Sequence, residues 1–236
     1  MRLDKFLADL QIGTRSQVKE FIKKGLVTVN SETITKADFK INELADYITC
    51  KGIVLTYQKY RYFLLHKPAG VVTATKDNHE QTVMDLLPKE LSKDFFPVGR
   101  LDKDTEGFLL ITNDGELSHK LLSPKKHVSK TYYVECHGSL TEAKLRQLEQ
   151  GVDIGDDKPT LPATVEVIHH NEDSYVIHLT ITEGRFHQVK RMIHAVDGEV
   201  TYLKRLSMGG LSLEESLAKG SYRELSLEEV EILKEK

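Results

Sequence analysis

One aspartate, Asp102, lies in surroundings that could support chemistry. It follows the run Phe95-Phe96-Pro97-Val98-Gly99 and precedes Asp104-Thr105-Glu106-Gly107, so aromatic and turn-forming residues flank it. Loops held by rigid elements often carry catalytic groups, and a positioned, ionised carboxylate can act as a nucleophile. The same tetrapeptide, Arg-Leu-Asp-Lys, also occurs at residues 2–5. There we interpret Asp4 as a first-turn helix acid, so the surroundings and not the tetrapeptide indicate the site.

A second set of chemically useful side chains follows Gly184. The residues at one helical spacing (i, i+3, i+4, i+7) are apolar and predict a buried stripe: Val189, Met192, Ile193 and Val196. The residues at the same spacing two positions earlier are cationic or titratable: His187, Lys190, Arg191 and His194. The two sets lie on roughly opposite faces of the predicted helix. The polar row fits a solvated surface and equally fits the wall of a cleft.

Motifs for metals and nucleotide cofactors are missing from the sequence. There is no Cys-x-x-Cys or His-Glu-x-x-His pattern, and neither glycine-rich phosphate-loop pattern occurs. His169 and His170 are adjacent, so they would point to opposite sides of a strand. His187 and His194 are two helical turns apart. We therefore expect no metal and no cofactor.

The elements that position these residues divide the chain into two parts. Residues 1–24 predict two helices with a break at 11–13, the second opened by a Thr14–Gln17 capping box. Short strands at 27–29 and 53–55 and a turn at Asn30-Ser31 complete a unit of 59 residues, followed by a linker at 57–61. Beyond it, strands are predicted at 62–65, 108–112, 132–136, 165–168 and 175–182. Helices are predicted at 82–87, from after Gly115 to Leu122, at 140–150 and after Gly184.

Charge divides in the same way. The 236 residues carry 33 basic and 36 acidic side chains, for a net charge of -3, which excludes a uniformly basic nucleic-acid coat protein. Residues 1–59 hold 10 basic and 7 acidic side chains, so the first part is basic and the remainder is acidic. Two cysteines, no long apolar run and no signal peptide predict a cytoplasmic protein without membrane spans.

Four motifs in order resemble those of RNA pseudouridine synthases. They are Lys67-Pro68-Ala69-Gly70, the stretch Val98-Gly99-Arg100-Leu101-Asp102-Lys103-Asp104-Thr105-Glu106-Gly107, Lys130-Thr131-Tyr132, and Glu183-Gly184-Arg185-Phe186-His187-Gln188-Val189-Lys190-Arg191-Met192. Residues 1–59 resemble an S4 RNA-binding domain, although Asn30-Ser31 stands where such domains usually have Asn-Gly. The last motif and Gly220-Ser221-Tyr222-Arg223-Glu224-Leu225 are most similar to the small-subunit ribosomal RNA pseudouridine synthase A branch.

The resemblance implies an α+β fold: a small S4 domain over residues 1–59 and a catalytic domain over 60–236, built on a mixed, mostly antiparallel sheet. It implies that Asp102, Tyr132 and Lys190 are catalytic, with Lys190 paired to Asp102 and Tyr132 stacked on an extruded uracil. The implied substrate-binding residues are Arg100, Val189, Arg191 and His187. RNA-binding candidates on other surfaces are Arg15, Lys19, Lys23, Lys126 and Lys130.

The implied reaction converts uridine to pseudouridine in 16S ribosomal RNA, at a uridine 516-type site. The expected partner is ribosomal RNA or a ribosome assembly intermediate, acted on by a monomer. Two alternatives stay open: a 23S large-subunit enzyme, and a non-catalytic RNA-binding or assembly factor that keeps the fold. The combination of Asp102, Tyr132 and Lys190 argues against the last, because a binding protein has no use for all three.

Overall fold

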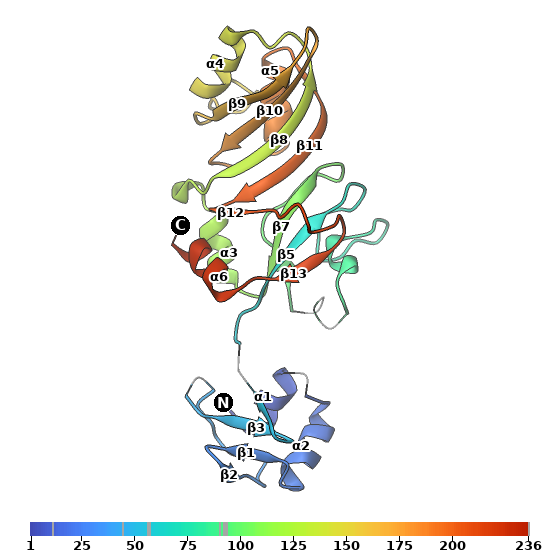
Figure 1. Ribbon diagram of the computed structural model, residues 1–236, viewed down its shortest axis with the longest axis vertical. Coiled ribbons are helices and arrows are strands. Elements are labelled where there is room, and N and C mark those ends of the chain that lie inside the picture. The colour runs from blue at the N-terminus through green and yellow to red at the C-terminus, as the bar shows by residue number, and fades with distance from the viewer. Residues whose placement is uncertain (11, 44, 56–57, 90, 92–93, 236) are drawn as a thin grey trace. The chain divides into compact units, whose positions relative to one another are not determined.

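A computed structural model describes residues 1–10, 12–43, 45–55, 58–89, 91 and 94–235. The chain forms two compact units, Met1–Lys59 and Tyr60–Lys236 (Figure 1). Parts of the predicted helix break at 11–13 and of the predicted linker at 57–61 lie outside the described residues. Within the described residues, no helix has the length and apolar character needed to cross a membrane.

The first unit places two helices against a four-stranded sheet of order β2-β1-β3-β4. Its elements are α1 (Leu3–Asp9), α2 (Arg15–Lys23), β1 (Val27–Val29), β2 (Glu32–Thr33), β3 (Ile48–Cys50) and β4 (Ile53–Leu55). The Thr14–Gln17 capping box is confirmed, and Asn30 and Ser31 form the predicted turn with φ of 50° and 71°. Asp4 lies in the first turn of α1 and pairs with Arg2, as its interpretation as a helix acid requires.

The second unit is built on a nine-stranded sheet whose main path is β13-β5-β7-β11-β8-β10-β9. Its strands are β5 (Tyr62–Lys67), β6 (Phe96–Pro97), β7 (Glu106–Thr112), β8 (Lys130–His137), β9 (Thr164–His170), β10 (Ser174–Ile181), β11 (Glu199–Met208), β12 (Leu211–Ser212) and β13 (Tyr222–Glu224). Every pairing is antiparallel except that of β7 with β11. The expected mixed, mostly antiparallel α+β fold is confirmed.

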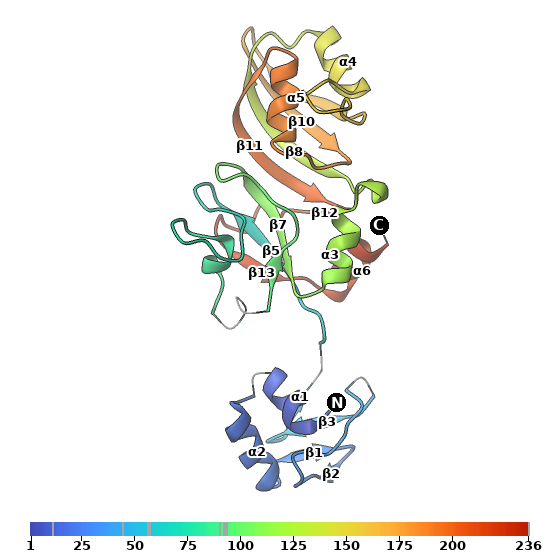
Figure 2. The same ribbon diagram turned by 180° about the vertical axis from the view of Figure 1, so that it is seen from behind.

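Helices cover both faces of this sheet (Figures 1 and 2). They are α3 (Gly115–Leu122), α4 (Glu142–Gln150), α5 (Gln188–Ala195) and α6 (Leu227–Lys234), with 3₁₀ helices η1 (Val83–Leu86) and η2 (Pro124–Lys126). Alternate residues of β5 and β7 enter two cores because successive strand side chains point to opposite faces. Leu64 and Phe108 pack with α3 and α6, whereas Leu65 and Leu109 belong to the core that contains α5.

The helix after Gly184 begins one residue too late to include His187, the first residue of the predicted polar row. Its first residue is Gln188, and His187 precedes it as the N-cap in the left-handed conformation, with φ of 48°. The prediction that His187 belongs to the helical face with Lys190 was therefore wrong. The apolar stripe is confirmed, since Val189, Met192 and Ile193 are buried.

Candidate active site

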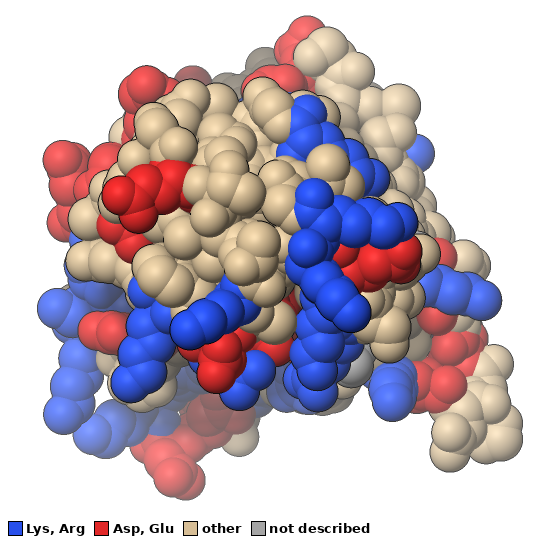
Figure 3. Space-filling model, turned by 90° about the horizontal axis from the view of Figure 1, so that it is seen from below, with Lys and Arg blue, Asp and Glu red and all other residues tan. Residues whose placement is uncertain are grey.

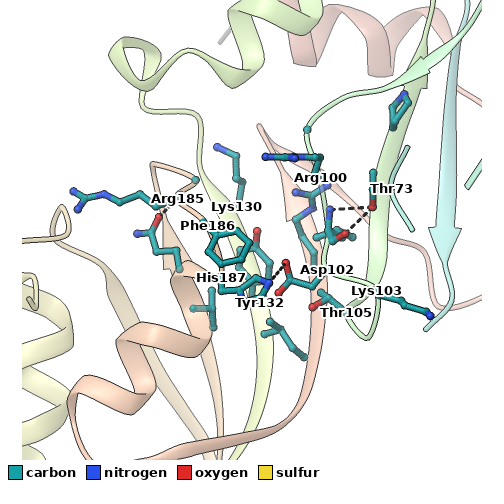
Figure 4. Close-up of a pocket in the computed structure, with 18 of the residues that line it drawn as sticks. Thr73, Arg100, Asp102, Lys103, Thr105, Lys130, Tyr132, Arg185, Phe186 and His187 are labelled. Carbon is teal, nitrogen blue, oxygen red and sulfur yellow. Dashed lines mark hydrogen bonds and ion pairs between the residues drawn. The ribbon is translucent and has the colours of Figure 1, made fainter. Parts of the chain in front are cut away.

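A cleft of about 750 Å³ opens in the second unit where β7 and β11 run parallel (Figure 4). Its walls come mainly from five segments distant in sequence: residues 72–75, residues 96–105, the start of β8, the loop 184–190 before and into α5, and β11. Leu122 of α3 and Ile181 of β10 complete the lining. Asp102, Tyr132, Lys190 and His187, four of the predicted site residues, line this one cleft. The fold thus brings together groups that are separated by up to 88 positions in the sequence.

The backbone on both sides of Asp102 is fixed by hydrogen bonds. Thr73 Oγ1 donates to the Leu101 carbonyl at 2.7 Å and accepts from the Leu101 amide at 3.2 Å. The Thr105 amide donates to the Asp102 carbonyl at 3.1 Å. The Asp102 side chain retains 24% of its exposure and faces the cleft. A carboxylate on a backbone held in this way is positioned before any substrate arrives.

Lys67 anchors the same loop from beneath, and the sequence analysis did not single it out. Its side chain is fully buried, and Nζ donates to the carbonyls of Thr105, Asp102, Pro68 and Lys103 at 2.8, 3.0, 3.1 and 3.2 Å. Burial lowers the pKa of Lys67 to about 8, against the opposing pull of nearby carboxylates. The ammonium form, which these four acceptors favour, therefore predominates at neutral pH. In the sequence, the position of Lys67 in the Lys-Pro-Ala-Gly motif could have indicated that it belongs to the site.

Gly107 makes the close approach of β7 and β11 possible. A Cβ atom at this position would lie 2.2 Å from the Arg205 carbonyl oxygen, and φ is +109°. No side chain fits there without moving the backbone of β11. The missing side chain at Gly107, five residues after Asp102, therefore allows β7 and β11 to pack closely beside the cleft.

A lysine and a histidine flank the Asp102 carboxylate. Lys190 Nζ lies 3.3 Å from Oδ2, and His187 Nε2 lies 3.5 Å from Oδ1. Lys190 makes shorter contacts with both carboxylate oxygens of Asp104, at 2.7 and 2.8 Å. Burial alone would lower the pKa of Lys190, but its hydrogen bond to Asp104 and the charges of Asp102 and Asp104 raise it above the usual value. Lys190 is thus shared between two carboxylates and stays charged.

Tyr132 and Val189 form apolar parts of the cleft. Tyr132 is 8% exposed on β8, and Val189 is 4% exposed at the start of α5. Arg100, in contrast, is exposed and lines the same cleft two residues before Asp102. A flat ring and an aliphatic wall beside a carboxylate can hold a planar base while the carboxylate reaches its sugar or ring atoms.

Lys130 does not lie on an exposed basic strip with Lys126, and this part of the prediction was wrong. Lys126 is exposed on η2, whereas Lys130 is 7% exposed, lines the cleft and donates to the Val128 carbonyl. Burial and then the charge of Arg205 lower the pKa of Lys130 to about 8. Arg205 is 2% exposed, and within the described part of the chain no carboxylate pairs with either cation. The cleft wall therefore carries positive charge that forms no ion pair with a carboxylate of the described residues.

Arg191 is not among the residues that line the cleft, and its binding of substrate stays a prediction. Its guanidinium donates to the carbonyls of Ile154 and Phe186 and pairs with Asp156. These contacts hold residues 154–156 against the loop before α5. Three further residues missed by the sequence analysis brace that loop: Glu183, Arg185 and Gln188, joined by hydrogen bonds of 2.8 to 3.0 Å.

The remaining predicted RNA contacts lie in the first unit. Arg15, Lys19 and Lys23 are exposed along α2, while Val18 and Ile22 on its other side are buried. Figure 3 shows Lys and Arg side chains gathered on one face with acidic side chains among them. Among the described residues, no cluster of three or more His, Cys, Asp or Glu could hold a metal ion.

The second unit combines a mixed sheet with a carboxylate beside Lys190 and His187 in a cleft, and a small helix-and-sheet unit precedes it in the sequence. The family model described as RNA pseudouridylate synthase matches residues 61–195, and the S4 domain model matches residues 1–43. The chain therefore belongs to the RNA pseudouridylate synthase family, whose members are isomerases.

Curated relatives match the chain along its whole length. The uncharacterized RNA pseudouridine synthase YtzG of Bacillus subtilis is 48% identical and covers 100% of this chain and 99% of its own. Ribosomal small subunit pseudouridine synthase A of Vibrio cholerae is 40% identical over 98% of both chains. Ribosomal large subunit pseudouridine synthase B of Bacillus subtilis is 37% identical over 99% of this chain and 95% of its own. A crystal structure of a pseudouridylate synthase superposes with a TM-score of 0.69 at 37% identity over 99% of both chains.

Proposed function

We propose that this enzyme isomerises one uridine of small-subunit ribosomal RNA, at the uridine 516-type site, in the cytoplasm and as a monomer. The observation that carries the catalytic part is the fixed Asp102 carboxylate between Lys190 and His187 in the cleft. The similarity to small-subunit pseudouridine synthase A along the whole chain supports the choice of RNA. The substrate is free ribosomal RNA or an assembling particle.

The reaction breaks the C1′–N1 bond of uridine, turns the uracil and rejoins it through C5. The proton on C5 is lost and N1 regains one, so atoms and electrons balance without a redox partner. Asp102 is the negative group that meets the electron-poor centre formed when the C1′–N1 bond breaks, by attack or by charge stabilisation. Lys190, 3.3 Å from that carboxylate, orients it and offers it a positive charge. Tyr132 stacks on the uracil, and its phenol is placed to help move the proton.

RNA binding divides between the two units in this proposal. A uridine within folded RNA leaves its stack before a side chain reaches it, and exposed Arg100 fills the vacated place. Val189 and His187 form the walls around the extruded base. The exposed stripe Arg15, Lys19 and Lys23 contacts phosphates, together with Lys126 on the catalytic unit.

Pseudouridine mapping of ribosomal RNA tests the proposal. Cells that lack the protein should lack one pseudouridine in 16S RNA, and the wild-type gene should restore it. The Asp102→Asn variant should fold and bind RNA but should not restore the pseudouridine. The Asp4→Asn variant, in the copy of the tetrapeptide at residues 2–5, should restore it fully. A missing site in 23S RNA selects the large-subunit alternative, which the 37% identical relative favours. An unchanged modification pattern would refute an action on ribosomal RNA, and turnover by Asp102→Asn would refute the role of Asp102.

The S4 assignment has its own test. Replacing Arg15, Lys19 and Lys23 with glutamine removes three exposed charges, so the slope of log affinity against log salt should fall by about 2 to 3. Binding of a 16S transcript is measured between low and physiological salt. An unchanged slope would show that this stripe does not contact phosphates.

A further inference from the structure

Phe186 is an exposed aromatic ring at the mouth of the catalytic cleft. Its exposed fraction is 72%, although it lies beside the buried residues Val189 and Tyr132 that line the same cleft. Its ring is stacked on the His187 ring, with centroids 3.8 Å apart and planes 18° apart (Figure 4). Covering this ring with a flat apolar surface would remove its exposed area from water, which favours binding at this position.

The loop holds this ring in a fixed position. Arg191 Nη1 donates to the Phe186 carbonyl at 3.1 Å, and the Arg185 amide donates to Gln188 Oε1 at 2.9 Å. His187 adopts a left-handed backbone conformation that residues other than glycine rarely take. Such conformations persist where the surroundings impose them, and they gather at functional sites. The stack on His187 and the braced loop therefore orient the Phe186 ring at the mouth of the cleft before any RNA binds.

The stacked rings of Phe186 and His187 connect the mouth of the cleft to the Asp102 carboxylate. His187, beneath the Phe186 ring, lies 3.5 Å from the Asp102 carboxylate. Tyr132, only 8% exposed, can stack with a base only inside the cleft. Phe186 presents most of its surface to solvent, so a base can cover it without occupying the position beside Tyr132.

We propose that Phe186, supported by His187, is a stacking platform for the nucleobase next to the target uridine. The inference rests on the proposed function, in which one uridine leaves its stack and enters the cleft. Its departure exposes a face of the neighbouring base, and aromatic rings are the usual partners of unstacked bases in RNA recognition. Phe186 is a positioning residue: it fixes the strand so that the extruded uridine meets Asp102.

A double-mutant cycle between protein and RNA tests this inference. The substrate is a synthetic RNA that spans the mapped uridine, used intact and with an abasic nucleotide on either the 5′ or the 3′ side of that uridine. On intact RNA, Phe186→Ala should lower kcat/KM by about 5- to 150-fold, the range for loss of one base stack. Phe186→Trp should stay within about threefold of wild type, whereas Phe186→Leu, which is apolar but not flat, should behave like the alanine variant.

The matched control is Leu227→Ala, since Leu227 in α6 is 73% exposed and lies outside the cleft lining. It should not change kcat/KM. One of the two abasic RNAs should lower wild-type turnover about as much as Phe186→Ala does and should not lower the turnover of Phe186→Ala further. Losses that multiply for both abasic RNAs would overturn the stacking role, as would full activity of Phe186→Leu. Failure of wild-type enzyme to modify the intact RNA would refute the proposed function instead.

Discussion

The ammonium group of Lys67 holds the backbone that carries Asp102, so its removal should loosen the site and destabilise the catalytic unit. Lys67→Met keeps the length and the apolar stem of the side chain and removes only the charge and its donors. Four carbonyl oxygens then lose their shared donor, and two of them belong to Asp102 and Lys103 in the catalytic loop.

The size of the effect follows from two opposing contributions. A hydrogen bond to a charged group stabilises a fold by about 1.5–3 kcal/mol, and an ammonium has three protons to share, so the bonds contribute about 6 kcal/mol. The pKa of Lys67 falls from 10.5 to about 8 on folding, which corresponds to a burial cost of about 3 kcal/mol. The methionine variant avoids that cost, so we expect a net loss of about 3 kcal/mol in the free energy of unfolding.

Urea unfolding of the full chain at pH 7, followed by far-ultraviolet circular dichroism, measures this loss. Lys103→Met is the matched control, because Lys103 lies in the same loop and pairs with Glu80 at 2.7 Å on the surface. An exposed pair contributes less than about 1 kcal/mol. The Lys67 variant should also lose kcat more than KM, since the loop carries Asp102. An unfolding midpoint equal to that of wild type would show that the four bonds do not stabilise the fold.

Two further predictions follow from the closest contacts and the buried charge of the cleft. Gly107→Ala should destabilise the protein by more than about 4 kcal/mol, because its Cβ would collide with the Arg205 backbone; Gly70→Ala, at φ +88° with nothing nearby, should cost about 1 kcal/mol in a thermal melt. Equal losses in both variants would contradict the steric argument. The pKa of Lys130 is about 8 in the folded chain and 10.5 unfolded, so the unfolded chain binds more protons between these values. The stability of wild type relative to Lys130→Met should therefore rise with pH from about 8 to 10.5, by at most about 3 kcal/mol; a difference that falls or stays constant would contradict the lowered pKa.

Local features of the chain were predictable because neighbouring residues cause them. The apolar spacing of residues 189–196 and the capping box at Thr14 depend on contacts within one or two turns, and both are confirmed. The family resemblance also selected Asp102, Tyr132 and Lys190, which all line one cleft. Even here the helix start was missed by one residue, since the left-handed N-cap at His187 depends on the braced loop around it.

The sequence by itself determined the motif residues and many of the local helices and strands, because these follow from periodicity, turn chemistry and residue type. It did not predict β11 or α6. Tertiary structure alone decided which cations are buried and what they contact. Lys130 and Lys126 look alike in sequence, yet β8 carries one into the cleft and leaves the other exposed. Arg191 neighbours Lys190 but turns to Ile154 and Asp156. Lys67 finds three of its four acceptors 35 to 38 residues away. Burial and long-range partners arise from the packing of distant strands, and no local pattern records them.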